Sequence, residues 1–219
     1  MILSSQSFDG ESDISSQICI VGAGAAGITL ACELDGSGVS VVLLEASGTG
    51  ISGRVSQDPY AGTEKGGHLP PSDFRRRAFG GSTTIWGGRC VPYDPIDFER
   101  REYATNSGWP ITYAEMARYY PKAMNYCDAG KFDFSVTGSL DDQDSTIPGL
   151  DPDGAVEADL IERYSLPTNF GARYRQILEH SDYVRVFTHA LALRMLKERV
   201  GDRIVSIEFA TRSGDAARV

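Results

Sequence analysis

Long apolar segments and positive charge are both scarce in this sequence of 219 residues. Its longest apolar runs, at 18–21 and, interrupted by Ser40, at 39–44, are far shorter than the roughly 20 residues that a helix needs to cross a bilayer. Thirty acidic residues against 21 basic ones give a formal net charge of −9, which removes any general attraction for nucleic acid or anionic lipid. We therefore expect no membrane segment and no nucleic-acid partner.

The chain has few cysteines, and its amino terminus lacks the features of a secretory signal. The four cysteines, at positions 19, 32, 90 and 127, lack the spacing of metal ligands, which favours buried free thiols over a metal site or a disulfide framework. The amino terminus, MILSSQSFDGESDISSQ, is polar and acidic and has neither the basic start nor the apolar core of a signal peptide. This predicts a cytoplasmic protein in which residues 1–16 form a flexible leader.

What is present is enough apolar sequence, 41% of residues, for a sizeable core. An apolar strand at 18–21, a glycine turn at 22–27, a helix at 28–34 and a second strand at 39–44 form a βαβ unit, which predicts an α/β fold with a parallel sheet. The segment 112–127 begins with the capping box Thr112–Glu115 and predicts a helix that Pro121 kinks or ends. After a loop-rich excursion at about 128–165, we expect a helix at 172–180 and strands at 184–187 and 203–210. The segment 190–198 is predicted as a strand or an extended arm, and 216–219 as the beginning of another strand.

The glycine turn has the pattern of a dinucleotide-binding site. Gly22 permits a tight turn after the strand, Gly24 lets a pyrophosphate approach the backbone, and Gly27 lets the helix pack against the sheet. The helix N-terminus offers free N–H groups and a positive dipole to phosphates. Glu45 stands at the end of the second strand, roughly 20 residues further on, where its carboxylate can accept both ribose hydroxyls. The predicted site comprises Gly22, Gly24, Ala25, Ala26, Gly27 and Glu45, and this motif alone does not distinguish FAD from NAD.

A second glycine-rich segment, RAFGGSTTIWGG at 77–88, provides the distinction. With PYDPIDF at 92–98, SGWPI at 107–111, the Tyr119–Tyr120 helix and FGARY at 170–174, it resembles the glucose-methanol-choline (GMC) family of flavin oxidoreductases. In that family a GGS-containing segment lies along the pyrophosphate and ring of the flavin. The resemblance covers most of 14–219 and is greater to the pyranose-oxidase and sugar-acid dehydrogenase branches than to the choline branch. Without the family, the segment could equally be a surface turn.

The resemblance implies a Rossmann-type FAD-binding domain over 17–219 with a β-meander. It adds to the site Arg77, which could offset phosphate charge, then Gly80, Gly81, Ser82, Thr83, Trp86, Gly87 and Gly88 along the flavin, and Ala192 at the adenine. Some members attach FAD through a histidine just before the tryptophan, but this chain has Ile85 there, so we expect non-covalent FAD.

The implied activity is oxidation of a CH–OH group of a sugar, polyol or other alcohol by hydride transfer to flavin N5, with oxygen, a quinone or another carrier as electron acceptor. His68, His180 and His189 match none of the family's catalytic positions, so we expect no catalytic residue in this chain and no activity from it alone. The chain ends where a strand begins and lacks the strand expected beside 18–21, which suggests a piece truncated before the substrate domain. The alternatives are a non-enzymatic FAD- or NAD-binding module and an inactive fragment.

Overall fold

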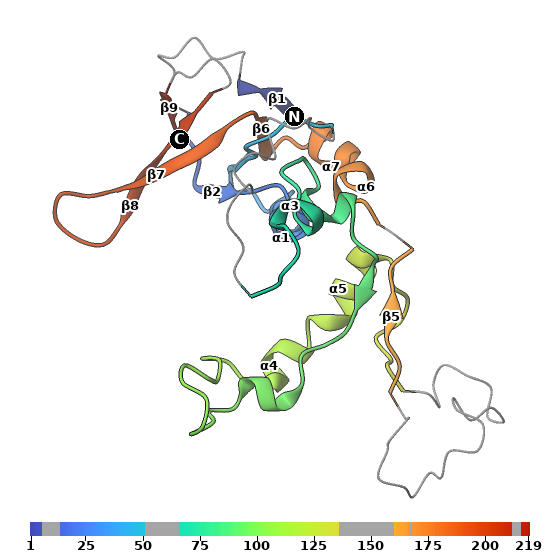
Figure 1. Cartoon of the computed structure of the whole chain (residues 1–219). Helices are drawn as coiled ribbons and strands as arrows, with labels where there is room; N and C mark the ends of the chain where they lie inside the picture. Colours follow the sequence, from blue (N-terminus) through green and yellow to red (C-terminus); the bar gives the residue numbers. More distant parts are fainter. Residues whose placement is uncertain (6–13, 51–65, 136–159, 167, 212–215) are drawn as a thin grey trace, which may run out of the picture. The chain divides into compact units, whose positions relative to one another are not determined.

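The computed structural model describes residues 1–5, 14–50, 66–135, 160–166, 168–211 and 216–219. They form two compact units, one of Met1–Trp86 with Asn169–Val219 and the other of Gly87–Thr168 (Figure 1). The sequence predicted one domain over 17–219. Within that range, residues Gly87–Thr168 form a separate compact unit. Most of the predicted loop-rich excursion, at 136–159, lies outside the described residues.

A parallel sheet of four strands organises the first unit. The strand order is β1 (Ile2–Ser4), β6 (Val184–Thr188), β3 (Val41–Leu44) and β2 (Ile18–Val21). All four residues of β3 are buried, because both of its faces are covered and both of its edges are paired. The helix α1 (Ala25–Leu34) connects β2 to β3, so the predicted βαβ unit and the α/β fold are confirmed. Within the described residues, β2 pairs with β3 alone.

Different layers cover the two faces of this sheet (Figure 1). On one face lie α1, α6 (Phe170–Arg173) and α7 (Arg175–His180), which bury Ile28 and Leu178 completely. The other face packs against the predicted meander, an antiparallel sheet of β7 (Leu191–Lys197), β8 (Ile204–Ala210) and β9 (Ala216–Arg218). Alternate residues of β8 point inward, so Ile207 and Phe209 join Val42, Leu44 and Phe187 in one apolar cluster.

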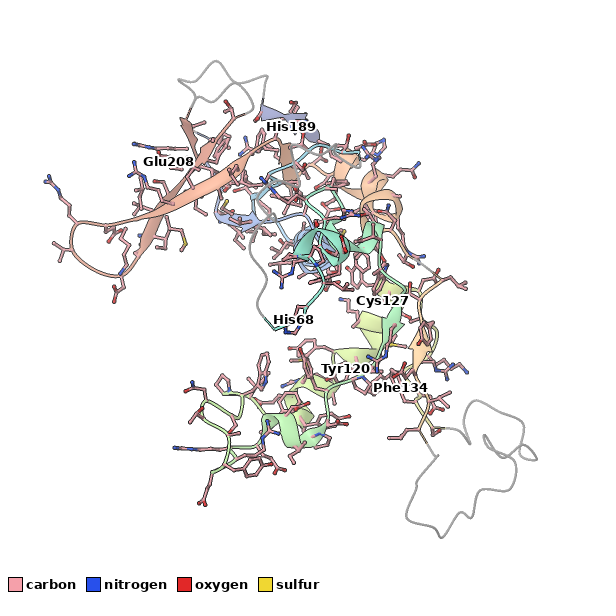
Figure 2. All side chains as sticks on the ribbon, viewed as in Figure 1. His68, Tyr120, Cys127, Phe134, His189 and Glu208 are labelled. Carbon is pink, nitrogen blue, oxygen red and sulfur yellow. The ribbon has the colours of Figure 1, made fainter. Side chains whose placement is uncertain are left out.

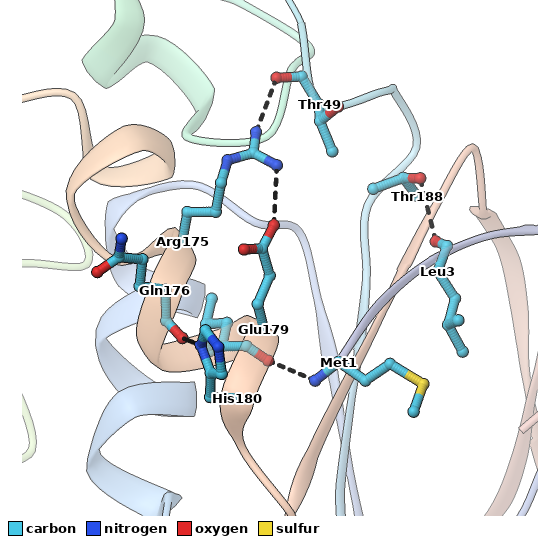
Figure 3. Close-up of polar contacts among 9 residues, drawn as sticks. Met1, Leu3, Thr49, Arg175, Gln176, Glu179, His180 and Thr188 are labelled. Atoms are coloured by element: carbon cyan, nitrogen blue, oxygen red, sulfur yellow. Dashed lines mark hydrogen bonds and ion pairs between the residues drawn. The ribbon is translucent and has the colours of Figure 1, made fainter.

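The predicted flexible leader at 1–16 is wrong for the residues that the structure describes there. Ile2–Ser4 pair in parallel with Val186–Thr188. The Met1 ammonium donates to the carbonyl oxygen of Leu178 at 2.5 Å, and the Thr188 hydroxyl donates to the carbonyl oxygen of Leu3 at 3.1 Å (Figure 3). Ile14 is only 6% exposed. Ile2 and Leu3 thus reach the sheet and Ile14 reaches the core, and no local signal in the sequence predicts these long-range contacts.

The second unit, described by itself, is a small helical and aromatic assembly. The predicted helix at 112–127 is two helices, α4 (Tyr113–Ala117) and α5 (Tyr120–Cys127), because Pro121 lies in the first turn of α5. The capping box of Thr112 and Glu115 is present, and those hydrogen bonds lower the pKa of Glu115. Tyr120 stacks on Phe132 with ring centroids 5.1 Å apart. The short strands β4 (Arg89–Cys90) and β5 (Arg163–Tyr164) pair antiparallel.

The remaining short elements are α3 (Pro71–Phe74), η3 (Gly81–Thr84) and η4 (Pro95–Phe98). Over the described part of the chain, no helix combines the length and the apolar character that crossing a membrane requires.

Candidate dinucleotide site

The first glycine turn joins β2 to α1 by close backbone contact. Gly22 has a φ of +98° and its N–H donates to the carbonyl oxygen of Leu44 at 2.7 Å. A Cβ on Gly27 would lie 1.9 Å from the carbonyl oxygen of Gly22, so only glycine lets the helix begin this close to the turn. Gly24 is the N-cap of α1 and has no side chain to cover the helix N-terminus. This is the local geometry that phosphate binding at a helix N-terminus uses.

Glu45 ties this turn to the end of β3. One carboxylate oxygen accepts the N–H of Ala23 at 2.9 Å, and the other accepts the N–H of Ser47 at 2.9 Å. Burial raises the pKa of Glu45, while the two N–H donors and the positive charge of Arg77 act to lower it. Each carboxylate oxygen has a further lone pair, so this carboxylate can still accept a hydroxyl. The sequence analysis did not predict that Glu45 accepts these two backbone N–H groups and so holds the turn.

The second glycine segment lies against the first. The N–H of Gly80 donates to the carbonyl oxygen of Ala23 at 2.7 Å. A Cβ on Gly81 would lie 2.8 Å from the Cα of Gly24. Gly80 and Gly81 both have positive φ, at 102° and 56°. Two glycine segments far apart in the sequence therefore meet at the start of α1.

The hydroxyl groups predicted along the flavin are already used to hold this loop. The Thr83 hydroxyl donates to the carbonyl oxygen of Gly80 at 2.5 Å and accepts the N–H of Phe170 at 3.1 Å. The Ser82 hydroxyl accepts the N–H of Arg76 at 3.1 Å. The Trp86 ring meets the Phe170 ring edge to face at 6.4 Å. In the described structure these side chains position the loop.

A pocket of about 280 Å³ opens where these elements converge. That volume is near the lower end of small-molecule sites. Several predicted residues line it, namely Gly22, Gly24, Glu45, Arg77, Gly81 and Ala192. The lining residues that were not predicted are Val21, Leu44, Ala46, Arg76, Ala190 and Leu191. A signal for two of them existed, because Ala190 and Leu191 directly precede Ala192 in the sequence.

The other predicted site residues do not line this pocket. Ala25, Ala26 and Gly27 form the first turn of α1, and Gly87 and Gly88 begin the second unit. The remaining four, Gly80, Ser82, Thr83 and Trp86, belong to the second glycine segment. None of the described residues that line the pocket is a histidine. The Nδ1 atom of His180 lies 2.8 Å from the carbonyl oxygen of Gln176 (Figure 3). His189, labelled in Figure 2, follows β6 and has a φ of 57°.

A Rossmann-type dinucleotide-binding domain is the class of protein that this fold and this pocket define. The family model described as an NAD(P)-binding Rossmann-like domain matches residues 20–78. Over the described residues the chain has the mixed α/β fold with a Rossmann-type parallel sheet that the sequence predicted.

Three known proteins are similar to parts of this chain or to its fold. Pyridoxine 4-oxidase from Mesorbium loti superposes with a TM-score of 0.51 at 17% identity, over 94% of this chain and 48% of that one. Formate oxidase from Aspergillus oryzae gives a TM-score of 0.49 at 14% identity, over 95% of this chain and 44% of that one. The 6'''-hydroxyparomomycin C oxidase of Streptomyces lividus is 27% identical over 123 residues, which are 51% of this chain and 22% of the relative. The chain therefore spans less than half the length of these proteins.

Proposed function

We propose that this chain is the FAD-binding part of a GMC-type oxidoreductase that oxidises CH–OH groups of a sugar, polyol or other alcohol. The observation that carries the proposal is the pocket at the start of α1, where both glycine segments, Glu45 and Ala192 converge. FAD bound there would supply the hydride acceptor. Oxygen, a quinone or another carrier would then take up the electrons.

The charges around the pocket suit an adenine dinucleotide. The open N-terminus of α1 and the side chains of Arg76 and Arg77 favour a pyrophosphate. Glu45 favours free ribose hydroxyls and disfavours a 2′-phosphate. FAD is proposed over NAD because a second glycine loop lies against the first, as the GMC resemblance leads one to expect. Ile85 has no nucleophilic atom, so the proposed FAD is held without a covalent bond.

The whole protein's reaction needs residues that the pocket does not supply. The described lining of the pocket holds no histidine, so the proposal assigns these residues binding and not proton transfer. We propose that the chain by itself does not oxidise alcohols. Turnover of a sugar alcohol with a dye acceptor by the purified chain would contradict this part of the proposal.

FAD titration of a matched pair of variants tests the binding site. In Gly24→Ala the new Cβ meets nothing nearer than the Cα of Gly81 at 4.0 Å, so the fold tolerates it at an N-cap cost of about 1 kcal/mol. The methyl group would occupy the approach of a pyrophosphate, and we expect FAD affinity to fall at least ~10-fold, or about 1.4 kcal/mol. Gly50→Ala, outside the pocket and with open space around its Cβ, is the control. Equal FAD affinity in both variants would refute the placement.

A non-enzymatic dinucleotide-binding module is the second candidate, favoured by the match of residues 20–78 to an NAD(P)-binding family model. Thermal-shift measurements with each nucleotide separate the two. The flavin proposal expects FAD to raise the melting temperature and to stay with the desalted chain as a yellow colour. Stabilisation by NAD with none by FAD would replace the flavin proposal, and stabilisation by neither would favour an inactive fragment.

A further inference from the structure

The second unit contains a cavity of about 900 Å³ that the proposed dinucleotide site does not use. One short segment, 100–107, lines it, with the exception of Tyr103. Its volume falls within the roughly 300–1,000 Å³ of small-molecule sites. All of its lining residues belong to the second unit, whereas those of the dinucleotide pocket belong to the first. The cavity is therefore a candidate site for a ligand of its own.

Hydrogen bonds and close packing close the base of this segment. The N–H of Arg101 donates to the hydroxyl oxygen of Ser107 at 2.7 Å, and that hydroxyl donates to the carbonyl oxygen of Arg101 at 3.0 Å. The N–H of Ala104 donates to the same carbonyl oxygen at 3.1 Å. Gly108 has a φ of 82°, and a Cβ there would lie 3.1 Å from the backbone nitrogen of Arg100. The backbone that carries the lining side chains is thus fixed in advance, which lowers the cost of ordering it on binding.

The side chain of Arg101 has an unmet hydrogen-bonding group in this segment. Its Nε atom is the one buried side-chain nitrogen or oxygen without a hydrogen-bond partner among the residues that the structure describes. A buried donor without an acceptor costs free energy, and native proteins seldom contain one. An oxyanion that binds side-on to a guanidinium accepts from Nε and from one terminal nitrogen together. Such a ligand would supply the acceptor that Arg101 lacks.

The charges of the lining favour an anion with a single charge. Arg100 and Arg101 are positive and Glu102 is negative, which leaves one positive charge in excess in a chain of net charge −9. Neither arginine takes part in the ion pairs of the described residues. Glu102 would repel the second charge of a phosphate dianion. Thr105 and Asn106 also line the cavity and offer a hydroxyl and an amide to other polar groups of a ligand.

We propose that the cavity of segment 100–107 binds the carboxylate of a small organic anion. The carboxylate lies side-on against the guanidinium of Arg101, and Arg100 adds positive charge beside it. The volume leaves room for an organic group beyond the carboxylate, and Thr105 and Asn106 favour one that carries hydroxyl groups. This inference does not rest on the proposed function, because no residue of the dinucleotide pocket takes part in it.

An NMR titration of the full chain tests this site. The probe is D-gluconate, and its matched control is D-glucitol, which has the same polyol chain without the carboxylate. We expect D-gluconate to shift the backbone amide signals of 100–108 to saturation and to bind at least ~10-fold more tightly than D-glucitol. Inorganic phosphate at neutral pH is the competing anion, and we expect it to bind more weakly than D-gluconate because of the charge of Glu102.

A matched pair of variants assigns the binding to Arg101. Arg101→Gln removes the charge and the two-pronged donor, so its affinity for D-gluconate should fall at least ~10-fold, while its FAD titration should match that of the parent chain. Arg118→Gln is the control, because Arg118 is an exposed residue of the same unit that does not line the cavity. It should bind D-gluconate like the parent chain.

Four results would overturn the proposal. In the parent chain these are equal binding of D-gluconate and D-glucitol, tighter binding of phosphate than of D-gluconate, and shifts confined to residues outside 100–108. The fourth is an unchanged D-gluconate affinity in Arg101→Gln. The first three decide the matter even if a variant does not fold. FAD is titrated separately, so a failure of the carboxylate site would leave the proposed dinucleotide site standing.

Discussion

Replacing Glu45 by glutamine tests how the carboxylate holds the glycine turn. In the parent chain both carboxylate oxygens are acceptors, one for the N–H of Ala23 and one for that of Ser47, each at 2.9 Å. Glutamine keeps one acceptor oxygen but presents an NH₂ group to the other N–H. Ala23 is fully buried and Ser47 is 1% exposed, so water cannot replace the lost partner easily.

The magnitude follows from two opposed effects. Leaving a buried backbone donor without its acceptor costs about 1–3 kcal/mol. Glutamine also removes a charge whose burial is unfavourable, as the raised pKa of Glu45 indicates. We therefore expect Glu45→Gln to lower the free energy of unfolding by about 1 kcal/mol at neutral pH, the lower end of that range. Urea denaturation followed by circular dichroism measures it, with the exposed Glu179→Gln as the control, expected within about 0.5 kcal/mol of the parent.

The pH dependence of this difference is the sharper test. The folded pKa of Glu45 is raised above its ordinary value of 4.5, mainly by burial. Its contribution to stability is therefore greatest below the unfolded pKa and is lost as the pH rises through the folded pKa. Glutamine does not titrate, so the parent's advantage over Glu45→Gln should grow as the pH falls from neutral toward 4.5. An advantage that stays constant or shrinks over that range would refute the reasoning.

Three further outcomes are expected from the first unit. Gly27→Ala forces a Cβ to within 1.9 Å of the carbonyl oxygen of Gly22, so it should destabilise the chain by about 3 kcal/mol or more, and an unchanged thermal melt would contradict the contact. Phe209→Ala empties a fully buried site between the sheet and the meander, and urea denaturation should show a loss of about 3–5 kcal/mol. Extending the chain before Met1 removes the ammonium that donates to Leu178, and hydrogen exchange should then be faster in β1 and unchanged in β8.

Local sequence patterns predicted much of the fold. The apolar run 18–21, the glycine turn and the buried run ending at Leu44 predicted a βαβ unit because each signal lies within a few residues of its neighbour. The capping box at Thr112 was correct for the same reason. The fate of the amino terminus was not predictable in this way, because Ile2–Ser4 pair with Val186–Thr188 at the other end of the chain.

The same distinction between local signals and long-range contacts applies to the candidate site. The sequence by itself determined which residues permit a dinucleotide turn, since Gly22 and Gly27 meet conformational and steric demands that no other side chain satisfies. Only the tertiary structure decided that the second glycine segment lies against Gly24 and that Glu45 holds the turn. Those contacts depend on burial and on long-range packing, which no local pattern contains.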